Sequence, residues 1–479
     1  MFANHVSERV RAAVNTVCML CTGLCFCVFV GCGRSLPTVN RAVVDREVRG
    51  RTDASVARES HPGEVRIPPG IDTATGLTEE NAAAIALWNN AAFQATLADL
   101  GVARGDLIQA GLLANPQLNL LFPPLGSKQL EWTIFAPLEP LVLRKYRVEV
   151  ADRDFQRVCE DLVQNGLNVV RDARIGLIDL QLAEDRRRLA VENVAVVERL
   201  VELAGLRVDA GGSGELELVS ARLEAGQRRA ELAGLEQAVR IAETRLRLIL
   251  GLAAVDLPLR AVASPRVNAR AMELDEVVTT AIRDRPDVRA ARIAVQAAER
   301  RLELNRRSFL RVDGVLDGNN GGAGPNNMGP GLRFEVPIFN RNEGLVIRSQ
   351  WTVDQARHNY HAVHDRALTE VRVALGSFAQ AGGSLEILRR DVLPELQRVQ
   401  QLAETAWADG GDSYVVVLQT TAQVLTARQR EQELQADLRR AAAELSRSAG
   451  RRIDALEIQE TDLPVLPSAS TPAAEGQKP

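Results

Sequence analysis

The sequence predicts a mainly α-helical fold with a β-barrel portion, built from an internal duplication. Three observations predict it. Apolar residues recur at heptad spacing over long stretches, four short stretches alternate polar and apolar residues, and both patterns return in the same order about 200 positions later. Of the 479 residues, 46% are hydrophobic but only 4% are aromatic. That composition suits long helices packed side by side better than a large globular core.

Residues 1–31 are predicted to be a secretory signal peptide. Arg9 and Arg11 precede an apolar run from Val17 to Gly31, which is the layout of such peptides. The run is too short and too close to the N-terminus to be a reliable membrane span. Five of the six cysteines lie in this stretch or directly after it: Cys18, Cys21, Cys25, Cys27 and Cys32. We interpret these cysteines as part of the signal segment and not as metal ligands.

Cys32 is the predicted lipidation site. The stretch Phe29-Val30-Gly31-Cys32 resembles a bacterial lipobox, in which the cysteine becomes a lipid-bearing N-terminus. Phe29 departs from the Leu that is usual three residues before that cysteine, so plain signal cleavage nearby is the alternative. A cysteine that carries several acyl chains is enough for stable membrane anchoring. The chain is therefore expected to be lipid-anchored at its N-terminus.

Long helices are expected to make up most of the chain. They are predicted over residues 78–113, 141–209, 214–250, 273–308, 342–409 and 412–450. Heptad seams run along both halves, at Ala190, Val194, Val197, Val201 and Ala204 and again at Val392, Leu396, Val399, Ala403 and Ala406. A helix over 342–409 would be about 100 Å long, and Pro394 predicts a kink or bulge near its middle.

Four short strands are expected between the helices. They are predicted at about 116–122, 130–136, 309–317 and 331–339, with loops at 123–129 and 317–331. In the third strand, Leu310, Val312 and Leu316 alternate with charged residues. An aliphatic outer face with a polar inner face is typical of a membrane β-barrel wall; a half-buried sheet of a soluble protein is the alternative. About eight strands are needed to close a barrel, and an open edge cannot face lipid. The barrel interpretation therefore requires several chains that pool their strands, and three chains would give twelve.

The body of the chain is predicted to be one unit written twice. Pro137 and Pro337 lie 200 positions apart, and each stands where a strand is expected to give way to a long helix. Gly211 and Gly410 lie 199 apart, each in a short turn between two helices. The predicted units are 78–271 and 272–452, flanked by a loop-like periplasmic linker at 32–77 and a flexible C-terminal tail at 453–479. In a trimer, such a duplication would give a helical tube quasi-sixfold symmetry.

Several stretches of the two repeats follow a known pattern. They are QAGLLANPQLNL, RPDVRAARIAVQAAERRL and GLRFEVPIFNRNEG, together with the two glycine turns. Over residues 78–452 this order resembles the TolC-like outer-membrane efflux factor family, and GLLANPQL is most similar to its heavy-metal and drug efflux branch. The resemblance implies a homotrimeric outer-membrane channel with a large periplasmic portion. It also implies docking by a periplasmic adaptor and an inner-membrane pump, with passive conduction of small molecules or metal ions to the exterior.

The two glycine turns are the strongest candidate sites. The resemblance places Gly211, Gly212, Ser213, Gly410, Gly411 and Ser413 at the periplasmic tip, where an adaptor would dock. Tight helix connections need glycine in any case, which is the structural alternative. Asp409 and Asp412 would then line the tip aperture, where rings of acidic side chains can select cations. Solvated turn aspartates are the alternative interpretation of these two residues.

A row of three histidines is the other candidate site. His358, His361 and His364 lie three apart on one expected helix. A Zn²⁺ or Cu²⁺ site is chemically possible there, but a solvated or seam-lining row is the preferred interpretation, so no metal site and no cofactor are predicted. The sequence holds no catalytic triad, HExxH motif or phosphate-binding glycine loop. A net charge of −4 gives no reason to expect nucleic acid. The prediction is a channel and not an enzyme.

Three other functions stay open at this point. The same architecture could be the outer-membrane channel of a type I protein secretion system, and the sequence separates the two poorly. A periplasmic coiled-coil adaptor would carry one helical hairpin and compact β-domains. A structural coiled-coil lipoprotein would lack paired amphipathic strands. The two hairpins and the paired strands favour the channel.

Overall fold

The structure is a computed structural model of the chain. It describes residues 41–56, 61, 63–73, 76–122, 130–211, 214–262, 274–320, 327–408 and 414–452. The chain divides into two units, Met1–Val43 and Val44–Pro479, and apart from the first three residues of α2 all elements below belong to the second. The predicted signal peptide, Cys32 and the predicted tail at 453–479 lie outside the described residues.

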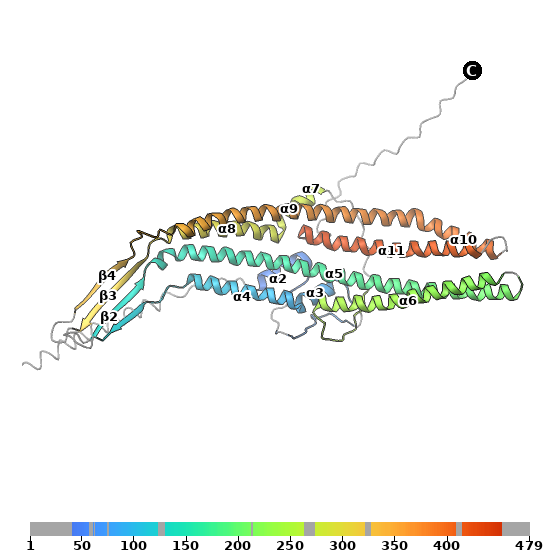
Figure 1. Cartoon of the computed structure of the whole chain (residues 1–479), viewed down its shortest axis with the longest axis horizontal. Coiled ribbons are helices and arrows are strands. Elements are labelled where there is room, and N and C mark those ends of the chain that lie inside the picture. Colours follow the sequence, from blue (N-terminus) through green and yellow to red (C-terminus); the bar gives the residue numbers. More distant parts are fainter. Residues whose placement is uncertain are drawn as a thin grey trace, which may run out of the picture. The chain divides into compact units, whose positions relative to one another are not determined.

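Within the second unit, helices and strands follow one another in two similar halves (Figure 1). The first half contains α3 (Glu79–Asn89), α4 (Ala91–Gly111), β1 (Gln117–Leu121), β2 (Leu130–Pro137), α5 (Glu139–Asp209) and α6 (Glu215–Leu250). The second contains α7 (Leu274–Asp284), α8 (Pro286–Arg307), β3 (Val312–Asn320), β4 (Asn327–Phe334), α9 (Glu343–Ile387), the π-helical segment η1 (Leu388–Val392), α10 (Leu393–Ala408) and α11 (Tyr414–Ala449). The strands lie at one end of the long helices, and the end of α5, the start of α6, the end of α10 and the start of α11 lie at the other.

The four strands form one antiparallel sheet in the order β1-β2-β3-β4. The predicted strands 309–317 and 331–339 are displaced from the observed ones, because β3 runs to Asn320 and β4 already begins at Asn327. Much of the expected loop 317–331 is therefore strand, with Gly318 paired to Met328 and Asn319 to Asn327. Glycine and asparagine have low strand propensity, so their pairing could not be foreseen from composition.

Two of the expected helices are each broken in two. Asn90 ends α3 and caps α4, since its side chain accepts a hydrogen bond from the backbone N–H of Phe93 at 3.0 Å. The second break falls at Arg285, directly before Pro286. A residue that precedes proline is pushed out of the helical region, and Arg285 has φ −64° and ψ 127° accordingly.

A kink or bulge was predicted near Pro394, and the structure has a short π-helical segment there, Leu388–Val392. Proline has no backbone N–H, so the helical hydrogen-bond ladder must be rearranged just before it. Val392 and Val399, which the heptad pattern placed in a seam, are 39% and 45% exposed in the single chain. Ala190, Val197 and Ala204 are buried as expected.

Each half has its own apolar core, which agrees with the predicted duplication. Side chains from α3, α5 and α6 surround Leu177 and Leu246 in the first half. Side chains from α7, α9 and α11 surround Phe378 and Leu445 in the second. Burial of one such side chain stabilises the fold by about 1.5–3 kcal/mol. The two cores are joined along α5, which also packs against α8 and α11.

The segment before the first repeat was predicted to be loop-like, but part of it is a helix. Residues Arg41–Thr52 form the helix α2, in which Val44 and Val48 are fully buried. A Cβ on Gly166 of α5 would lie 3.0 Å from the Val48 side chain, so the two helices approach closely. The helix could not be predicted from the sequence, because the segment is short and its apolar residues recur with only weak periodicity.

Candidate functional site

One face of the sheet is apolar. Directly paired residues of an antiparallel sheet point to the same face, so Leu118, Ile134 and Leu316 share one face through the observed register. Among the strand residues whose side chains the structure describes, that face carries only apolar residues and glycine: Leu118, Leu120, Leu130, Trp132, Ile134, Ala136, Val312, Gly314, Leu316, Gly318, Met328, Pro330, Leu332 and Phe334. Leu332 and Phe334 are 68% and 62% exposed, so a single chain leaves this face uncovered.

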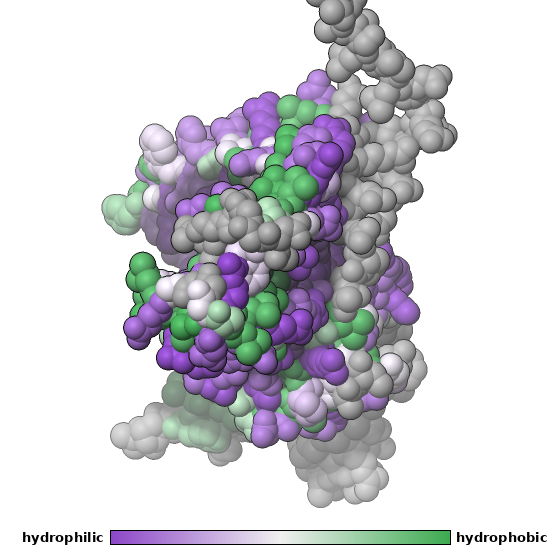
Figure 2. All heavy atoms as spheres, turned by 90° about the vertical axis from the view of Figure 1, so that its right-hand side faces the viewer, coloured by the Kyte–Doolittle hydropathy of each residue, from purple (hydrophilic) through white to green (hydrophobic). Residues whose placement is uncertain are grey.

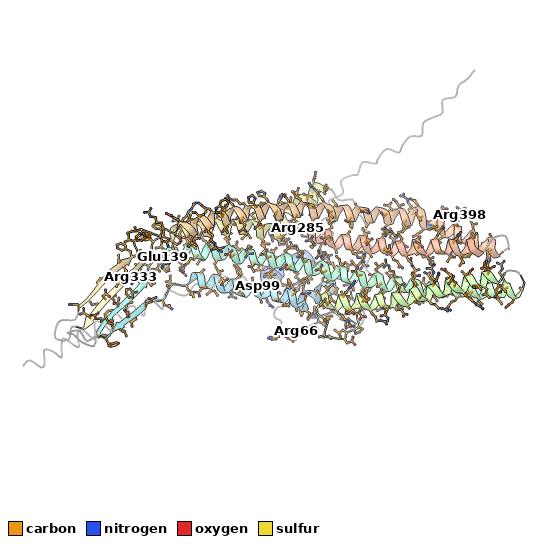
Figure 3. The ribbon with its side chains drawn as sticks, viewed as in Figure 1. Arg66, Asp99, Glu139, Arg285, Arg333 and Arg398 are labelled. Atoms are coloured by element: carbon orange, nitrogen blue, oxygen red, sulfur yellow. The ribbon has the colours of Figure 1, made fainter. Side chains whose placement is uncertain are left out.

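The opposite face holds all four charged residues of the described strands: Glu131, Asp313, Asp317 and Arg333. The Nη2 atom of Arg333 lies 2.9 Å from Oδ2 of Asp313, its direct cross-strand partner. The Arg333 guanidinium also stacks over the Phe135 ring, 4.6 Å from its centroid. Figure 3 places Arg333 within the sheet. A sheet that is apolar on one side and charged on the other matches a wall between lipid and water.

Trp132 covers the glycine that lies opposite it on β3. A Cβ atom built on Gly318 would lie 2.3 Å from the indole ring, which is far inside van der Waals contact. Only glycine leaves room for the ring, and the ring in turn shields a stretch of bare backbone on the apolar face.

Both outer strands of the sheet have an unpaired side. β1 and β4 are the two edges of the sheet, and all of β1 and β4 is exposed. Unpaired backbone N–H and C=O groups cannot be left in lipid, because each costs several kcal/mol there. The sheet of one chain is therefore incomplete as a membrane wall.

Pro137 and Pro337 both lie between a strand and a helix, but not equivalently. Pro137 is the last residue of β2, and α5 begins two residues later. Pro337 lies three residues beyond the end of β4 at Phe334. The interpretation of residues through 339 as strand is therefore wrong at this end. Asn342, with a left-handed φ of 63°, precedes α9 and donates to the Asn305 carbonyl of α8 at 2.7 Å. This role of Asn342 was not predicted from the sequence.

The described end of the α5–α6 hairpin contains Gly211. Its φ is +72°, and its N–H donates to the Val208 carbonyl at 2.9 Å. This left-handed conformation closes a helix end and favours glycine, whereas the space around it is open. The other predicted tip residues lie outside the described residues: Gly212, Ser213, Asp409, Gly410, Gly411, Asp412 and Ser413. Seen from this end, hydrophilic and hydrophobic side chains are interspersed over the described surface (Figure 2).

One aromatic contact joins the two hairpins near these ends. The Arg207 guanidinium of α5 lies 5.0 Å from the ring centroid of Trp407 in α10. Trp407 also packs beside the buried pair Ala204 and Ala221. The contact therefore fastens the second hairpin to the first.

The duplication extends to the junction at the other end of α6 and α11. Gly251 and Gly450, 199 positions apart, follow these helices with φ of +73° and +70°. Each lies against a helix break, Gly251 against Asn89 and Gly450 against Arg285. Asn90 donates to the Ile249 carbonyl at 2.9 Å, and Arg285 donates to the equivalent Ser448 carbonyl at 3.3 Å.

Two segments, residues 125–252 and 277–451, match the family model for outer membrane efflux proteins, and together they cover more than half of the chain. The chain belongs to this family. The two matched segments correspond to the two repeats, and the resemblance expected from the sequence is confirmed.

Curated relatives of this chain are named for metal resistance. The cobalt-zinc-cadmium resistance protein CzcC of Cupriavidus metallidurans is 24% identical over 404 residues, which cover 82% of this chain and 95% of the relative. The nickel-cobalt-cadmium resistance protein NccC of Alcaligenes xylosoxydans xylosoxydans is 23% identical over 291 residues, covering 57% and 65%.

Solved structures of outer-membrane channels share the fold. CusC superposes with a TM-score of 0.67 at 19% identity, over 83% of this chain and 99% of that one. VceC of Vibrio cholerae gives 0.66 at 16% identity, over 78% and 96%. The TolC-like fold class, helical with one four-stranded sheet, is thus confirmed. Outer membrane efflux proteins are channels, so the chain is not an enzyme, and the alternatives of an adaptor or a structural lipoprotein are wrong.

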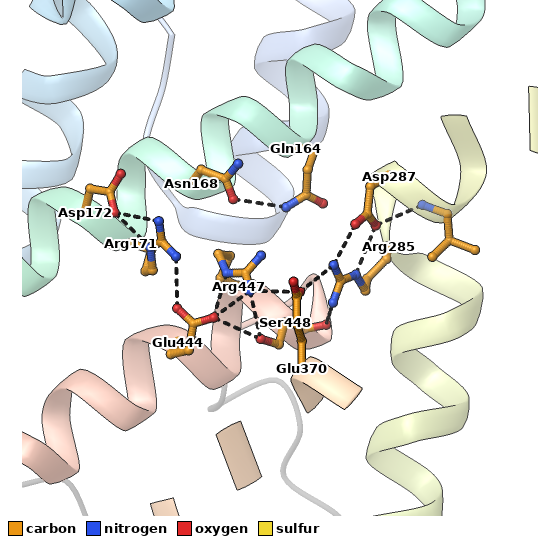
Figure 4. A network of polar contacts seen from close by, with 11 residues as sticks. Gln164, Asn168, Arg171, Asp172, Arg285, Asp287, Glu370, Glu444, Arg447 and Ser448 are labelled. Carbon is orange, nitrogen blue, oxygen red and sulfur yellow. Dashed lines mark hydrogen bonds and ion pairs between the residues drawn. The ribbon is translucent and has the colours of Figure 1, made fainter. Parts of the chain in front are cut away.

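In this outer membrane efflux protein, a polar network occupies the helix break of the second repeat (Figure 4). The Arg285 side chain is only 1% exposed, and its Nη2 lies 2.6 Å from Asp287 and 2.8 Å from Glu370. Arg447 binds Glu370 at 2.9 Å and also Glu444. The network thus ties α8, α9 and α11 together, and it was not predicted from the sequence.

Charge complementarity decides the ionisation of this network. Burial alone would raise the pKa of Glu370, but the hydrogen bonds and charges of Arg285 and Arg447 outweigh it and lower that pKa below its usual 4.5. The pKa of Glu444 is lowered in the same way, against burial, by Arg447 and Arg171. Arg171 lies 3.1 Å from Glu444, which extends the network to α5.

α2 reaches this junction through Arg51. Its Nη1 donates to the carbonyls of Asp284 at 2.9 Å and Gly450 at 3.0 Å. These carbonyls stand at the C-terminal ends of α7 and α11, where a positive charge is favourable. Arg51 therefore links the segment before the repeats to the second repeat.

The three histidines do not assemble a metal site in the described chain. His358 and His361 are exposed, and His364 lies 3.4 Å from Asp365. Among the described residues, no group of three or more His, Cys, Asp or Glu side chains is placed to bind a metal.

Cys159 of α5 is half-buried and not disulfide-bonded. Burial, with a smaller effect of the Glu160 charge, raises the pKa of its thiol to about 11. Such a thiol stays protonated at neutral pH and reacts slowly.

In the part of the chain that the structure describes, no helix has both the length and the apolarity to cross a bilayer.

Proposed function

We propose that this protein is the trimeric exit duct of a tripartite efflux system in the outer membrane. The observation that carries the proposal is the sheet: apolar on one face, charged on the other, and unpaired at both edges. Three chains that pair β4 with the β1 of a neighbour supply twelve strands, more than the eight or so that a barrel needs. Every strand edge is then paired, as lipid requires.

The long helices continue the barrel as a periplasmic tube. At about 1.5 Å per residue, the 71 residues of α5 span about 106 Å. The hairpin turns at 209–215 and 408–414 form the tip, where Gly211, Gly410 and their neighbours Gly212, Ser213, Gly411 and Ser413 receive a periplasmic adaptor. Asp409 and Asp412 border the tip aperture. Pro137 and Pro337 mark the joints between barrel and tube. An adaptor and an inner-membrane pump deliver the substrate, and the duct conducts it passively.

Divalent heavy-metal cations are the proposed substrate. Three curated relatives are named for resistance to cobalt together with zinc, cadmium or nickel. The alternative of a type I protein secretion channel has no comparable support. A lipid on Cys32 anchors the N-terminus in the same membrane.

Membrane fractionation and mass measurement test the duct. The full chain, expressed in a Gram-negative host, is expected in the outer membrane fraction and as a trimer by light scattering in detergent. A soluble monomer would contradict the proposal. Replacement of Cys32 by Ser should abolish labelling with a radioactive fatty acid; unchanged labelling would remove the lipid assignment.

Metal tolerance tests the substrate. Deletion of the gene in its own host should lower the cobalt concentration that permits growth, and the wild-type gene should restore it. Variants Gly211→Trp and Gly410→Trp should still form trimers but fail to restore tolerance, because a bulky side chain would block adaptor docking. Full tolerance in these variants would remove the docking role.

A further inference from the structure

α9 carries a bare apolar stripe on the side opposite its packed face. Ser349 and Val353 are buried, and the Ser349 hydroxyl accepts a hydrogen bond from Asn305 of α8 at 2.6 Å. Ile347 and Trp351, four residues apart, lie about 160–200° around the helix from Ser349 and are 54% and 71% exposed. A tryptophan left this open on a helix is a large apolar surface without a partner.

α4 carries a shallow bare face at the matching place. Phe93, Leu97 and other apolar residues bury one side of it. Val102 on the other side is 65% exposed, and a Cβ built on Gly101 or Gly105 would meet nothing within 4 Å. Helix-interior glycine costs about 1 kcal/mol relative to alanine. The chain keeps two such glycines beside an exposed valine, where its own helices do not need the space.

The chain itself shows how such a face is covered. α4 and α8 follow the equivalent caps Asn90 and Arg285, 195 positions apart. At that spacing Val102 corresponds to Ala297, which is only 3% exposed. One turn further along α8, Arg301 lies 2.6 Å from Asp154 of α5. In the second repeat, therefore, the face equivalent to the bare face of α4 is packed against a long helix that continues from a strand.

We propose that Trp351 of α9 packs against Val102, between Gly101 and Gly105, on α4 of a second copy of the chain. This rests on the proposed trimer. β4 leads into α9 and β1 follows α4, so pairing of β4 with the neighbouring β1 brings these two helices side by side. Trp351 is the ninth residue of α9 and Val102 the tenth from the end of α4, so both lie about 12–14 Å along their helices from the sheet-proximal ends.

Charged residues beside the proposed contact support the packing of α9 against α4 of a second copy. Within the chain, α8 contributes Arg301 to the ion pair and α5 contributes Asp154. The position equivalent to Arg301 in α4 is Asp106, which is exposed, and α9 presents the exposed Arg348 one turn from Trp351. The contact between chains thus offers an acidic side chain on α4 and a basic one on α9. Asp354, which corresponds to Asp154 at the 200-residue spacing, has Arg357 of its own helix 3.7 Å away.

Cysteine cross-linking tests the contact. Cys159→Ser removes the one free thiol of the described chain. In that background Val102→Cys with Trp351→Cys should give covalent dimers and trimers with a short bis-maleimide. The matched control is Val102→Cys with Gln350→Cys, since Gln350 is also exposed but points about 100° away. It should cross-link several-fold less.

The mass of the untreated assembly separates the two proposals. A trimer in which Trp351→Cys does not cross-link better than Gln350→Cys overturns this contact and leaves the exit duct standing. A monomer overturns both.

A charge exchange gives a second readout. Asp106→Arg or Arg348→Asp alone should lower the trimer yield several-fold, and the two together should restore it. Failure of the double variant to recover would contradict the opposed charges.

Discussion

The two repeats share a scaffold but use different chemistry at the same junction. In the first, the neutral Asn90 caps α4 and binds the end of α6. In the second, the buried Arg285 takes that place and gathers Asp287, Glu370 and the end of α11. The long helix of the first repeat is continuous, whereas its counterpart is interrupted by Leu388–Val392. The two repeats therefore share a backbone geometry, while the second carries a buried charge and a helix irregularity that the first lacks.

The largest expected effect comes from removing the charge on which the second junction depends. Arg285→Ala leaves the carboxylates of Asp287 and Glu370 without their buried partner and should cost about 3–5 kcal/mol of unfolding free energy. Asn90→Ala removes a helix cap and should cost about 1 kcal/mol. Chemical unfolding in detergent, followed by circular dichroism, measures both. Equal losses would mean that the two junctions do not differ as described. The control is Arg283→Ala, which removes only an exposed ion pair with Asp284 and should cost less than either of the other two substitutions.

The two left-handed glycines should respond unequally to alanine. A left-handed alanine costs roughly 1–2 kcal/mol at either position. At Gly251 the added Cβ would also lie 2.1 Å from the Asn89 carbonyl oxygen, whereas at Gly450 the nearest atom is 3.5 Å away. Gly251→Ala should therefore lower the Tm more than Gly450→Ala. The reverse order in thermal melts would show that the first junction is the looser one.

Acid should weaken the second junction selectively. The folded pKa values of Glu370 and Glu444 lie below the usual 4.5. Their contribution is therefore fully present above pH 4.5 and is lost as pH falls through the folded values. Glu370→Gln should have a lower Tm at neutral pH and a smaller further loss in acid than the wild type. If the wild-type Tm did not change as the pH fell below 4.5, the network would not be a source of stability.

The smallest effect is expected where the repeats touch near their tips. Arg207→Ala removes a cation–π contact with Trp407 worth about 0.5–1 kcal/mol. Trp407→Phe keeps an aromatic ring and should lose less. Hydrogen exchange of α10 should rise in Arg207→Ala without a change in α8; exchange that rises equally in both helices would mean a general loss of stability.

Much of the fold could be predicted because its signals are periodic. Heptads located every long helix, alternation located four strands, and glycine spacing revealed the duplication. The break at Asn90 was not predicted, because asparagine can also occur inside a helix. The hydrogen bonds of Asn90 with Phe93 and Ile249, which fix the break, cannot be inferred from the sequence. β3 and β4 were misplaced because tertiary pairing overrode the low strand propensity of Gly318 and Asn319.

The site was less predictable than the fold. The candidate turns could be predicted from their glycines and from the 199-residue spacing of Gly211 and Gly410. A left-handed backbone, such as that at Gly211, favours glycine. The network around Arg285 could not be found, because its partners Glu370 and Ser448 lie 85 and 163 positions away. One signal was available in the sequence. Pro286 forces a break in the helix at the residue before it, and that residue is an arginine, whose charge then lies among the helices.

The open edges of the sheet have a consequence for how this protein matures. On the proposed trimer, a lone chain has no stable resting place in the bilayer, since β1 and β4 would carry unpaired backbone into lipid. Insertion and assembly must then be one event, with a rate that depends steeply on the local concentration of chains. A tether that gathers newly exported chains on one membrane surface would shorten the search from three dimensions to two.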